Sequence, residues 1–259
     1  MTFETLLLDR DNGVVTLTLN RPERKNAVSG QMWSELLAVF REVSSSRDDR
    51  VLVVTGAGGD FCSGADVSGE DERGRDHHLG EMRHVGDVAL ALYRLPQPTI
   101  AKVRGVAVGA GLNMALLCDL VVADTTARFS EIFARRGLSI DFGGSWALPR
   151  RIGMHRAKEL ALLAEIIDAS AAERIGLVNQ VVPDGELDSF VDDWARRLAV
   201  GPPIALSQTK RLLNVGVGST LEQALDEEGA AQAINLVTAD VAEAMRAFRE
   251  KRQPRFEGR

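Results

Sequence analysis

The chain has 259 residues, of which 45% are hydrophobic and 26% charged, and its net charge at pH 7 is −6. This composition is that of a globular protein able to bury roughly three quarters of its unfolded surface, and its acidic balance excludes a typical nucleic-acid binder. No apolar run reaches membrane-spanning length, and residues 1–20 lack the pattern of a secretory signal. Cys62 and Cys118 suggest no disulfide framework, so we expect a cytoplasmic protein.

The first residues predict a β-hairpin followed by a helix. Residues 3–9 and 14–19 are typical of strands, and Asp-Asn-Gly at 11–13 is a strong turn signal between them. A polar loop with three cations follows at residues 20–27. Ser29 then has the character of a helix cap, because apolar residues recur after it at helical spacing.

Two predicted strands are each followed by a glycine-rich loop. Residues 51–55 and 99–103 are apolar runs typical of buried strands, and glycine-rich loops follow them at 56–67 and 105–111. Because ligands of open α/β sheets bind where such loops gather at the strand ends, we expect these two loops to form a binding site.

The second loop leads into a predicted buried helix. Residues 112–118 are almost wholly apolar, and Gly109 and Gly111 allow the main chain to turn sharply at Ala110. The first N–H groups of such a helix lack partners and lie at the positive end of its dipole, so a carbonyl oxygen or an oxyanion is expected to bind there. Close packing of the helix is the alternative explanation for the glycines.

Two familiar phosphate-binding motifs do not fit this loop. No Gly-Lys-Ser/Thr follows the glycines, which excludes a nucleotide P-loop. Met114 stands where a dinucleotide fingerprint needs a small residue, so that motif fails as well.

Residues 68–86 are polar and charged, and we interpret them as a mobile lid. The carboxylates from Glu70 and the histidines at 77 and 78 raise the alternative of a metal site. No repeated ligand spacing supports that alternative, and we assign no metal site. Residues 88–95 are helical in pattern and are ended by Pro96.

A lone aspartate follows the next buried strand, residues 120–123. Asp141 lies between apolar residues and is followed by Phe142 and two glycines. An apolar setting raises the pKa of an aspartate, as a general acid or base requires. A cap for the helix expected near Ser145 is the alternative role.

The remainder of the chain is helical in pattern, so the strands occupy roughly the first 150 residues. The basic tail, residues 246–259, could hold a phosphate-bearing ligand, with a solvated helical face as the alternative. A short strand is expected at 178–182, and helices are expected at 157–163, 171–175, 187–198, 204–213 and 221–248.

Four segments in this order, residues 20–27, 61–66, 105–119 and 176–183, resemble the crotonase (enoyl-CoA hydratase/isomerase) superfamily. The resemblance implies an α/β fold, a crotonase-like spiral of ββα units over residues 1–195 that binds acyl-CoA. It also implies a helical C-terminal region, residues 196–259, that assembles trimers and commonly hexamers. No metal or redox cofactor is implied, and CoA arrives as part of the substrate.

The same resemblance assigns binding roles by motif position. The thioester oxygen would be held between the backbone N–H groups of Ala65 and Ala110, an oxyanion hole that stabilises an enolate. Phe248 of the tail would reach the CoA of a neighbouring subunit. The remaining CoA contacts would fall on Lys25, Ala27, Ser63, Asp66 and Val67.

The chain departs from the family pattern where hydratases carry their two glutamates. Asn113 and Phe133 stand at those positions, and neither transfers a proton as a carboxylate does. Glu131 is two residues away from the second position, and we expect its side chain to point elsewhere. This pattern argues against hydration by two glutamates.

Asp141 is the carboxylate that the chain keeps. Residues 137–150 resemble the ring-epoxide isomerase type of the phenylacetyl-CoA pathway, and members of the superfamily that shift double bonds or isomerise rings place an acidic residue here. The resemblance therefore implies an acyl-CoA isomerase with Asp141 as acid and base. Asn113, Phe133 and Phe142 would line the substrate site, with Phe133, Phe142 and Trp146 excluding water.

Three alternatives remain open at this point. The chain could be an enoyl-CoA hydratase, or a hydrolase or dehalogenase in which Asp141 is the nucleophile and His84 or His78 assists. It could also be a non-catalytic acyl-CoA binder, in which Asp141 would serve as a helix cap. The acyl group is not determined, because residues 68–95 are expected to shape its pocket.

Overall fold

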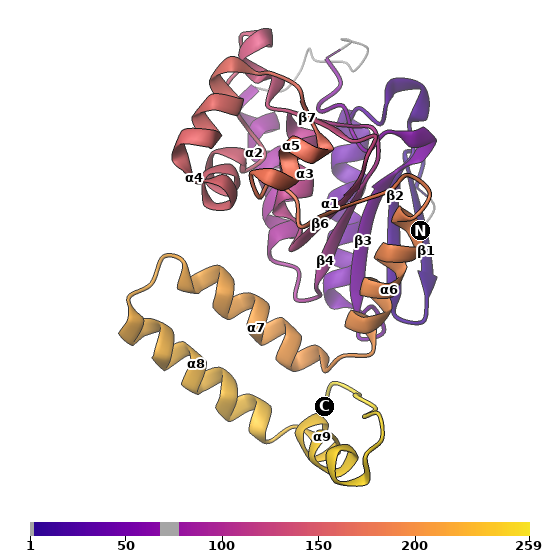
Figure 1. The fold of residues 1–259 in the computed structure, drawn as a ribbon, viewed down its shortest axis with the longest axis vertical. Helices are drawn as coiled ribbons and strands as arrows, with labels where there is room; N and C mark the ends of the chain where they lie inside the picture. The colour runs from indigo at the N-terminus through magenta and orange to yellow at the C-terminus, as the bar shows by residue number, and fades with distance from the viewer. Residues whose placement is uncertain (1–2, 68–77) are drawn as a thin grey trace.

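The structure is a computed structural model that describes residues 3–67 and 78–259. Its main sheet has six strands in the order β1-β2-β3-β4-β6-β9 (Figure 1). The expected hairpin is confirmed, with Asn12 and Gly13 both at positive φ in the turn. Among the described strands of this sheet, only the β1–β2 pair is antiparallel. The strands are Leu6–Asp11, Val14–Leu19, Val51–Gly56, Thr99–Val103, Leu120–Asp124 and Gln180–Val182.

A second, smaller sheet gives the fold its spiral. It has the order β5-β7-β8, with bounds Val106–Val108, Arg128–Ser130 and Ile167–Asp168. The chain passes from β4 to β5 and again from β6 to β7, and each time a helix follows the second strand. A bridge between Cys62 and Ala107 adds one more segment to this sheet. The expected spiral of ββα units is therefore confirmed.

Helices cover both faces of the main sheet because its strands carry apolar side chains on alternating faces. Leu52 and Val54 of β3 pack with helices α1, α2 and α3, whereas Val51 and Val53 pack against α6. The helices of this part are α1 (Gly30–Ser45), α2 (His78–Tyr93), α3 (Ala110–Leu117), α4 (Gly144–Leu163), α5 (Ala169–Arg174) and α6 (Leu187–Ala199). Short 3₁₀ turns are η1 (Pro22–Arg24), η2 (Ala57–Gly59) and η3 (Ile132–Arg136).

Two expectations about the helices were wrong. Residues 78–86, expected to belong to an irregular lid, are helical, because α2 begins at His78 and not near residue 88, and it buries Val85 and Leu92 on one face. The expected helix 221–248 is two helices, because Thr238 caps a new one by accepting from the N–H of Val241. Residues 68–77, which carry the rest of the expected lid, lie outside the described residues.

The last three helices lie apart from the sheets (Figure 1). They are α7 (Pro203–Gly216), α8 (Leu221–Leu236) and α9 (Ala239–Glu250), and α7 contacts α8, which contacts α9. Lys210 ties α7 to the segments that precede β6 and β4, by contacting the Asp119 carboxylate at 2.7 Å and the Gln97 carbonyl at 2.9 Å. The division of the chain at residue 195 stays a prediction, since α6 runs across that position.

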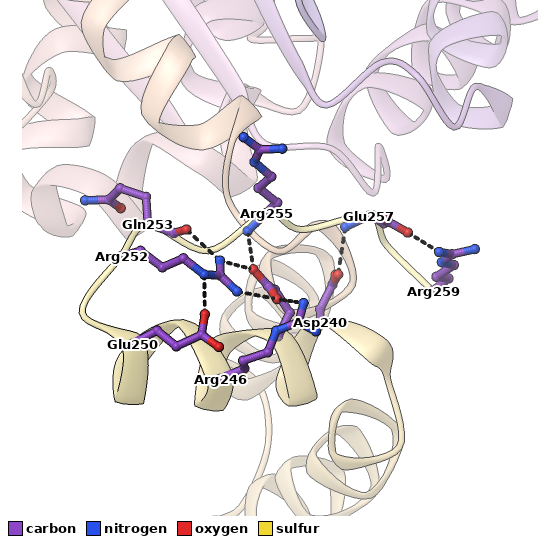
Figure 2. Close-up of polar contacts among 9 residues, drawn as sticks. Asp240, Arg246, Glu250, Arg252, Gln253, Arg255, Glu257 and Arg259 are labelled. Carbon is purple, nitrogen blue, oxygen red and sulfur yellow. Dashed lines mark hydrogen bonds and ion pairs between the residues drawn. The ribbon is translucent and has the colours of Figure 1, made fainter.

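Two carboxylates of α9 hold the C-terminal tail (Figure 2). Asp240 accepts the backbone N–H groups of Glu257 and Gly258 at 2.7 and 3.0 Å. Glu243 accepts from the Arg252 guanidinium at 2.6 Å and from the backbone N–H of Arg255 at 3.0 Å, and it also pairs with Arg246. The guanidinium groups of Arg246 and Arg252 are thus engaged within the chain. No described helix is long and apolar enough to cross a membrane.

Candidate active site

Three segments far apart in the sequence meet at the strand ends. Val28 donates its N–H to the Gly64 carbonyl at 2.8 Å, and Asp66 donates to the Val28 carbonyl at 2.9 Å. On its other side, the same segment exchanges hydrogen bonds with β5 through Cys62. A Cβ on Gly64 would lie 3.0 Å from the Val108 carbonyl oxygen and 3.7 Å from the Ala110 nitrogen. The two glycine-rich loops are therefore in direct contact, as expected.

Ala65 and Ala110 each offer a backbone N–H at this junction. Ala110 is the first residue of α3, after Gly109 at φ +55°, and the Gly109 N–H is already donated to the Ser130 carbonyl at 2.9 Å. Within residues 3–67 and 78–259, neither the Ala65 nor the Ala110 N–H has a hydrogen-bond acceptor. Two unpaired donors, one of them at the N-terminus of a buried helix, can hold an oxygen that carries negative charge.

Asn113 lies one turn further along α3 and is fully buried. Its Nδ2 donates to the Asp141 carbonyl oxygen at 3.0 Å and to Glu131 Oε2 at 3.4 Å. The structure thus brings Asn113, Asp141 and the helix that begins at Ala110 together, and it joins Glu131 to them.

Asp141 begins a tight turn before α4, in which Phe142 has φ +47° and Gly143 φ +78°. Its carboxyl does not cap α4, because the cap residue is Gly143 and no side chain makes a capping hydrogen bond there. Oδ1 is buried and has no partner among the described residues. Burial raises the pKa of Asp141 to about 6, because the charged form has lost hydration without gaining a hydrogen bond.

Glu131 corrects an expectation, since its side chain points into this site and not away from it. The residue is 0% exposed, and its Oε2 accepts from Asn113. Burial, and then the like charge of Asp141, raise the pKa of Glu131 to about 8 against the opposing hydrogen bond from Asn113. A second carboxyl that sequence reasoning placed elsewhere is therefore part of the site.

Aromatic side chains cover the site. A Cβ on Gly109 would lie 3.5 Å from the Phe133 ring, so Phe133 lies over the turn that precedes Ala110. Phe142 stacks on Trp33, with ring centroids 5.2 Å apart, and both are buried. Sequence reasoning did not identify Trp33 as a residue near the site. Its place in the first turn of α1, directly after the loop at residues 20–27, could have indicated it. Trp146, expected to exclude water, is 38% exposed and packs on Tyr93 and Arg150.

The residues expected to contact CoA lie around Ala65, with one exception. Arg21, which sequence reasoning missed, pairs with Asp66 at 2.8 Å and donates to the Ala27 carbonyl at 2.7 Å. The Lys25 carbonyl accepts the Ser63 N–H at 3.0 Å, and Val67 is 63% exposed beside them. Phe248 is the exception, since it is 83% exposed on α9, among the helices that lie apart from the sheets.

The histidines considered for a hydrolase make other contacts. His84 lies 3.3 Å from the Ser34 hydroxyl, and His78 pairs with Glu81 at 3.4 Å. No histidine of the described chain hydrogen-bonds to Asp141. No three described residues of the His, Cys, Asp or Glu types gather as metal ligands. Of the residues that raised that idea, His78 is described and residues 70–77 lie outside the described part.

Comparison with known proteins identifies relatives over the full length of the chain. The family model described as enoyl-CoA hydratase/isomerase matches residues 9–259. A Rhodobacter capsulatus protein named "probable enoyl-CoA hydratase" is 37% identical over 259 residues, 100% of both chains, and the 1,2-epoxyphenylacetyl-CoA isomerase of Escherichia coli is 38% identical over 260 residues, 99% of each. The crystal structure of enoyl-CoA hydratase from Bacillus anthracis superimposes with a TM-score of 0.95 at 31% identity, covering 99% of this chain and 100% of that one.

Proposed function

The chain belongs to the enoyl-CoA hydratase/isomerase family, and from this premise we propose that it is an acyl-CoA isomerase in which Asp141 transfers the proton. The substrate would be an enoyl-CoA whose double bond moves, or a ring-bearing acyl-CoA that rearranges. CoA would be part of the substrate, and no metal or redox cofactor would be needed.

The proposed reaction begins with the thioester oxygen held by the Ala65 and Ala110 N–H groups. Asp141 takes a proton from the carbon chain, and the electron pair of the broken C–H bond moves toward the thioester, placing negative charge on that oxygen. The two donors and the N-terminus of α3 stabilise this enolate, and one such donor is worth roughly a hundredfold to a thousandfold in rate. Asp141 then returns the proton to a different carbon, which completes the shift of the double bond.

The setting of the Asp141 carboxyl is the observation that carries this proposal. Asp141 is half-buried and its carboxyl caps no helix. Within the described chain its buried Oδ1 has no partner, and its backbone carbonyl is held by Asn113 of the helix that begins at Ala110. A pKa of about 6 suits both halves of the reaction, because the carboxylate is a competent base at neutral pH and the carboxylic acid readily gives the proton back.

A hydratase is the second candidate, and Glu131 is the observation that favours it. With Asp141 it would supply two carboxyl groups, one to activate water and one to protonate carbon. Relatives of similar identity carry both kinds of name. Against hydration, Asn113 and Phe133 occupy the positions at which the resemblance implies the two glutamates of hydratases.

We also propose that the protein works as a trimer or a dimer of trimers, with CoA reaching Phe248 of a neighbouring subunit. The support is the apolar surface of the last three helices, which a single chain leaves uncovered. No residue of α7 is buried, and the exposed apolar residues of this surface include Leu213, Leu221, Leu225, Ile234, Leu236, Val237 and Phe248.

Double-bond migration in a 3-enoyl-CoA tests the proposed function. We expect wild-type protein to form the conjugated 2-enoyl-CoA in the presence of a chelator, and Asp141→Asn to reduce kcat at least a hundredfold. Hydration of a 2-enoyl-CoA, measured on the same two proteins, is the comparison. Wild-type hydration that exceeds isomerisation would favour the hydratase, and solvent oxygen-18 found in Asp141 after turnover would favour the hydrolase.

A further inference from the structure

Glu131 is a buried carboxyl that the proposed mechanism does not use. It follows β7 and has none of its surface exposed, and its Oε1 has no hydrogen-bond partner among the described residues. A buried carboxyl that merely filled space would be costly, because the group loses hydration that an apolar side chain does not need. Its contacts therefore call for a functional explanation.

The amide of Asn113 connects Glu131 to the turn that bears Asp141. Both bonds come from the same Nδ2, at 3.4 Å to Glu131 Oε2 and 3.0 Å to the Asp141 carbonyl. Gly144 packs against the face of the amide, since a Cβ there would lie 2.3 Å from Asn113 Oδ1 and 2.4 Å from Nδ2. Asn113 is thus held between Glu131 and the start of α4, and its orientation depends on both.

The Asp141 turn needs such support. Phe142 adopts φ +47°, a left-handed conformation that costs a residue with a Cβ about 1–2 kcal/mol. Tertiary contacts must therefore maintain the turn, and the hydrogen bond from Asn113 to the Asp141 carbonyl is one of them.

The segment that carries Glu131 also contacts the other half of the site. The Ser130 carbonyl accepts the Gly109 N–H at 2.9 Å, and the Phe133 ring lies against Gly109. One short stretch, residues 130–133, therefore touches the turn before Ala110 directly and the Asp141 turn through Asn113.

We propose that Glu131 is a positioning residue that, through the Asn113 amide, sets the Asp141 carboxyl relative to the Ala65 and Ala110 donors. This inference rests on the proposed function, in which Asp141 must reach a carbon whose thioester oxygen those donors hold. A displacement of about 1 Å in such a geometry can cost roughly a hundredfold in rate.

The matched pair Glu131→Gln and Glu131→Met tests this role. Gln keeps an oxygen that accepts from Asn113, whereas Met has a similar length but no such acceptor. For isomerisation we expect Glu131→Gln to stay within about threefold of wild-type kcat, and Glu131→Met to lose about 10- to 100-fold in kcat with KM changed less than threefold. Rescue by Gln separates positioning from proton transfer, because an amide cannot replace a carboxyl as acid or base.

Two results would overturn the proposal. One is a Glu131→Met protein with wild-type kcat. The other is an equal, large loss in both variants, which would make Glu131 a proton-transfer group. Should Glu131→Met fail to fold, Gly144→Ala displaces the same amide by contact with its face, and a folded Gly144→Ala protein with wild-type kcat would contradict the role as well.

A structural readout tests the positioning role independently of the proposed function. Crystal structures would be compared for wild type, Glu131→Gln, and either Glu131→Met or Gly144→Ala. We expect the Asn113–Asp141 hydrogen bond to persist with Gln and to break in the Met or Ala variant, whether or not the wild type isomerises a chosen substrate. An unchanged Asp141 turn in the Met or Ala variant would refute the positioning role on its own.

Discussion

At the scale of single residues, the site depends on carboxyl groups that have lost water. Asp141 is half-buried, its Oδ1 has no partner within the described chain, and its pKa is about 6 because burial disfavours the charged form. Glu131 is buried more completely and retains its proton to a higher pH, about 8. Around neutral pH, therefore, Asp141 is mainly the base and Glu131 mainly neutral, which avoids two like charges beside one amide.

The pKa of Asp141 predicts an acid limb in the rate profile. Since the deprotonated form is the base, kcat/KM for isomerisation should rise with pH through about 6 and level off above it. Initial rates between pH 4.5 and 7.5 measure this limb. A limb near pH 4, the ordinary range of an exposed aspartate, would show that the free protein does not bury this carboxyl.

The pKa of Glu131 predicts how stability depends on pH. Its value in the folded protein lies above the unfolded value near 4.5, so between about pH 4.5 and 8 the folded state holds a proton that the unfolded state has lost. The contribution of Glu131 to stability is therefore fully present below that window and declines as pH rises through it. The side chain of Glu131→Gln does not titrate. When the pH is raised from 5 to 8, the free energy of unfolding of this variant should therefore increase by about 2–4 kcal/mol relative to that of wild type.

Urea unfolding of both proteins at the two pH values measures this difference. Glu165→Gln, at an exposed position, is the matched control. A gap between Glu131→Gln and wild type that stays constant with pH would mean that Glu131 is already ionised in the folded state at pH 5.

At the scale of elements, the first turn of α3 and the Cys62 segment set the spacing of the oxyanion donors. Gly111 makes this contact possible, because a Cβ there would lie 2.4 Å from the Cys62 carbonyl oxygen and 2.8 Å from its Sγ. The strand-like bridge between Cys62 and Ala107 leaves the segment little room to move away. Close approach, more than a special backbone angle, is thus the reason for glycine at this position.

Gly111→Ala should therefore separate the two donors. We expect a loss of about 1–3 kcal/mol in unfolding free energy from overpacking, and at least a tenfold loss in kcat/KM. Gly229→Ala in α8 is the control, since no atom lies within 4 Å of its added Cβ and alanine favours a helix. Thermal unfolding and the isomerase assay check both variants. Full activity in Gly111→Ala would show that the loops adjust without changing the hole.

At the scale of the whole molecule, the sheets and the last three helices have different characters. The sheets and α1 to α6 enclose the hydrophobic cores, whereas α8 buries only Ala231 and α7 buries no residue. Figure 1 shows these helices extending away from the sheets, and α9 ends in the tail held by Asp240 and Glu243. Uncovered apolar surface of this kind favours association with further copies of the chain.

Assembly through these helices predicts a solution mass of three or six times 28.1 kDa. Leu221→Glu, at a site 76% exposed in the single chain, should lower that mass by placing a charge in the interface. Leu7→Glu, at a 53% exposed position on β1, is the control. Sedimentation equilibrium measures both. A monomeric wild type would contradict the proposed assembly and the reach of Phe248 to a neighbour.

Much of the fold followed from local sequence patterns. The almost wholly apolar run of residues 112–118 predicted a buried helix, and the glycines before it predicted the turn at Ala110. Val51 to Thr55 predicted a strand covered on both faces, and Asn-Gly predicted the first hairpin. These features are local in the sequence. A buried helix or strand requires apolar residues at regular spacing, and a tight turn requires particular residues such as Asn-Gly, so both can be recognised from the sequence.

The sequence by itself therefore determined the buried helix, the paired glycine loops, and Asp141 as the acidic residue in an apolar setting. Tertiary structure alone decided that Glu131 faces Asn113, that Phe142 stacks on Trp33, and that short strands such as β5 and β7 form a second sheet. The physical reason is the same in each case. In a strand of three residues or an irregular segment such as that at Glu131, no period fixes the direction of a side chain, so contacts with distant segments set it.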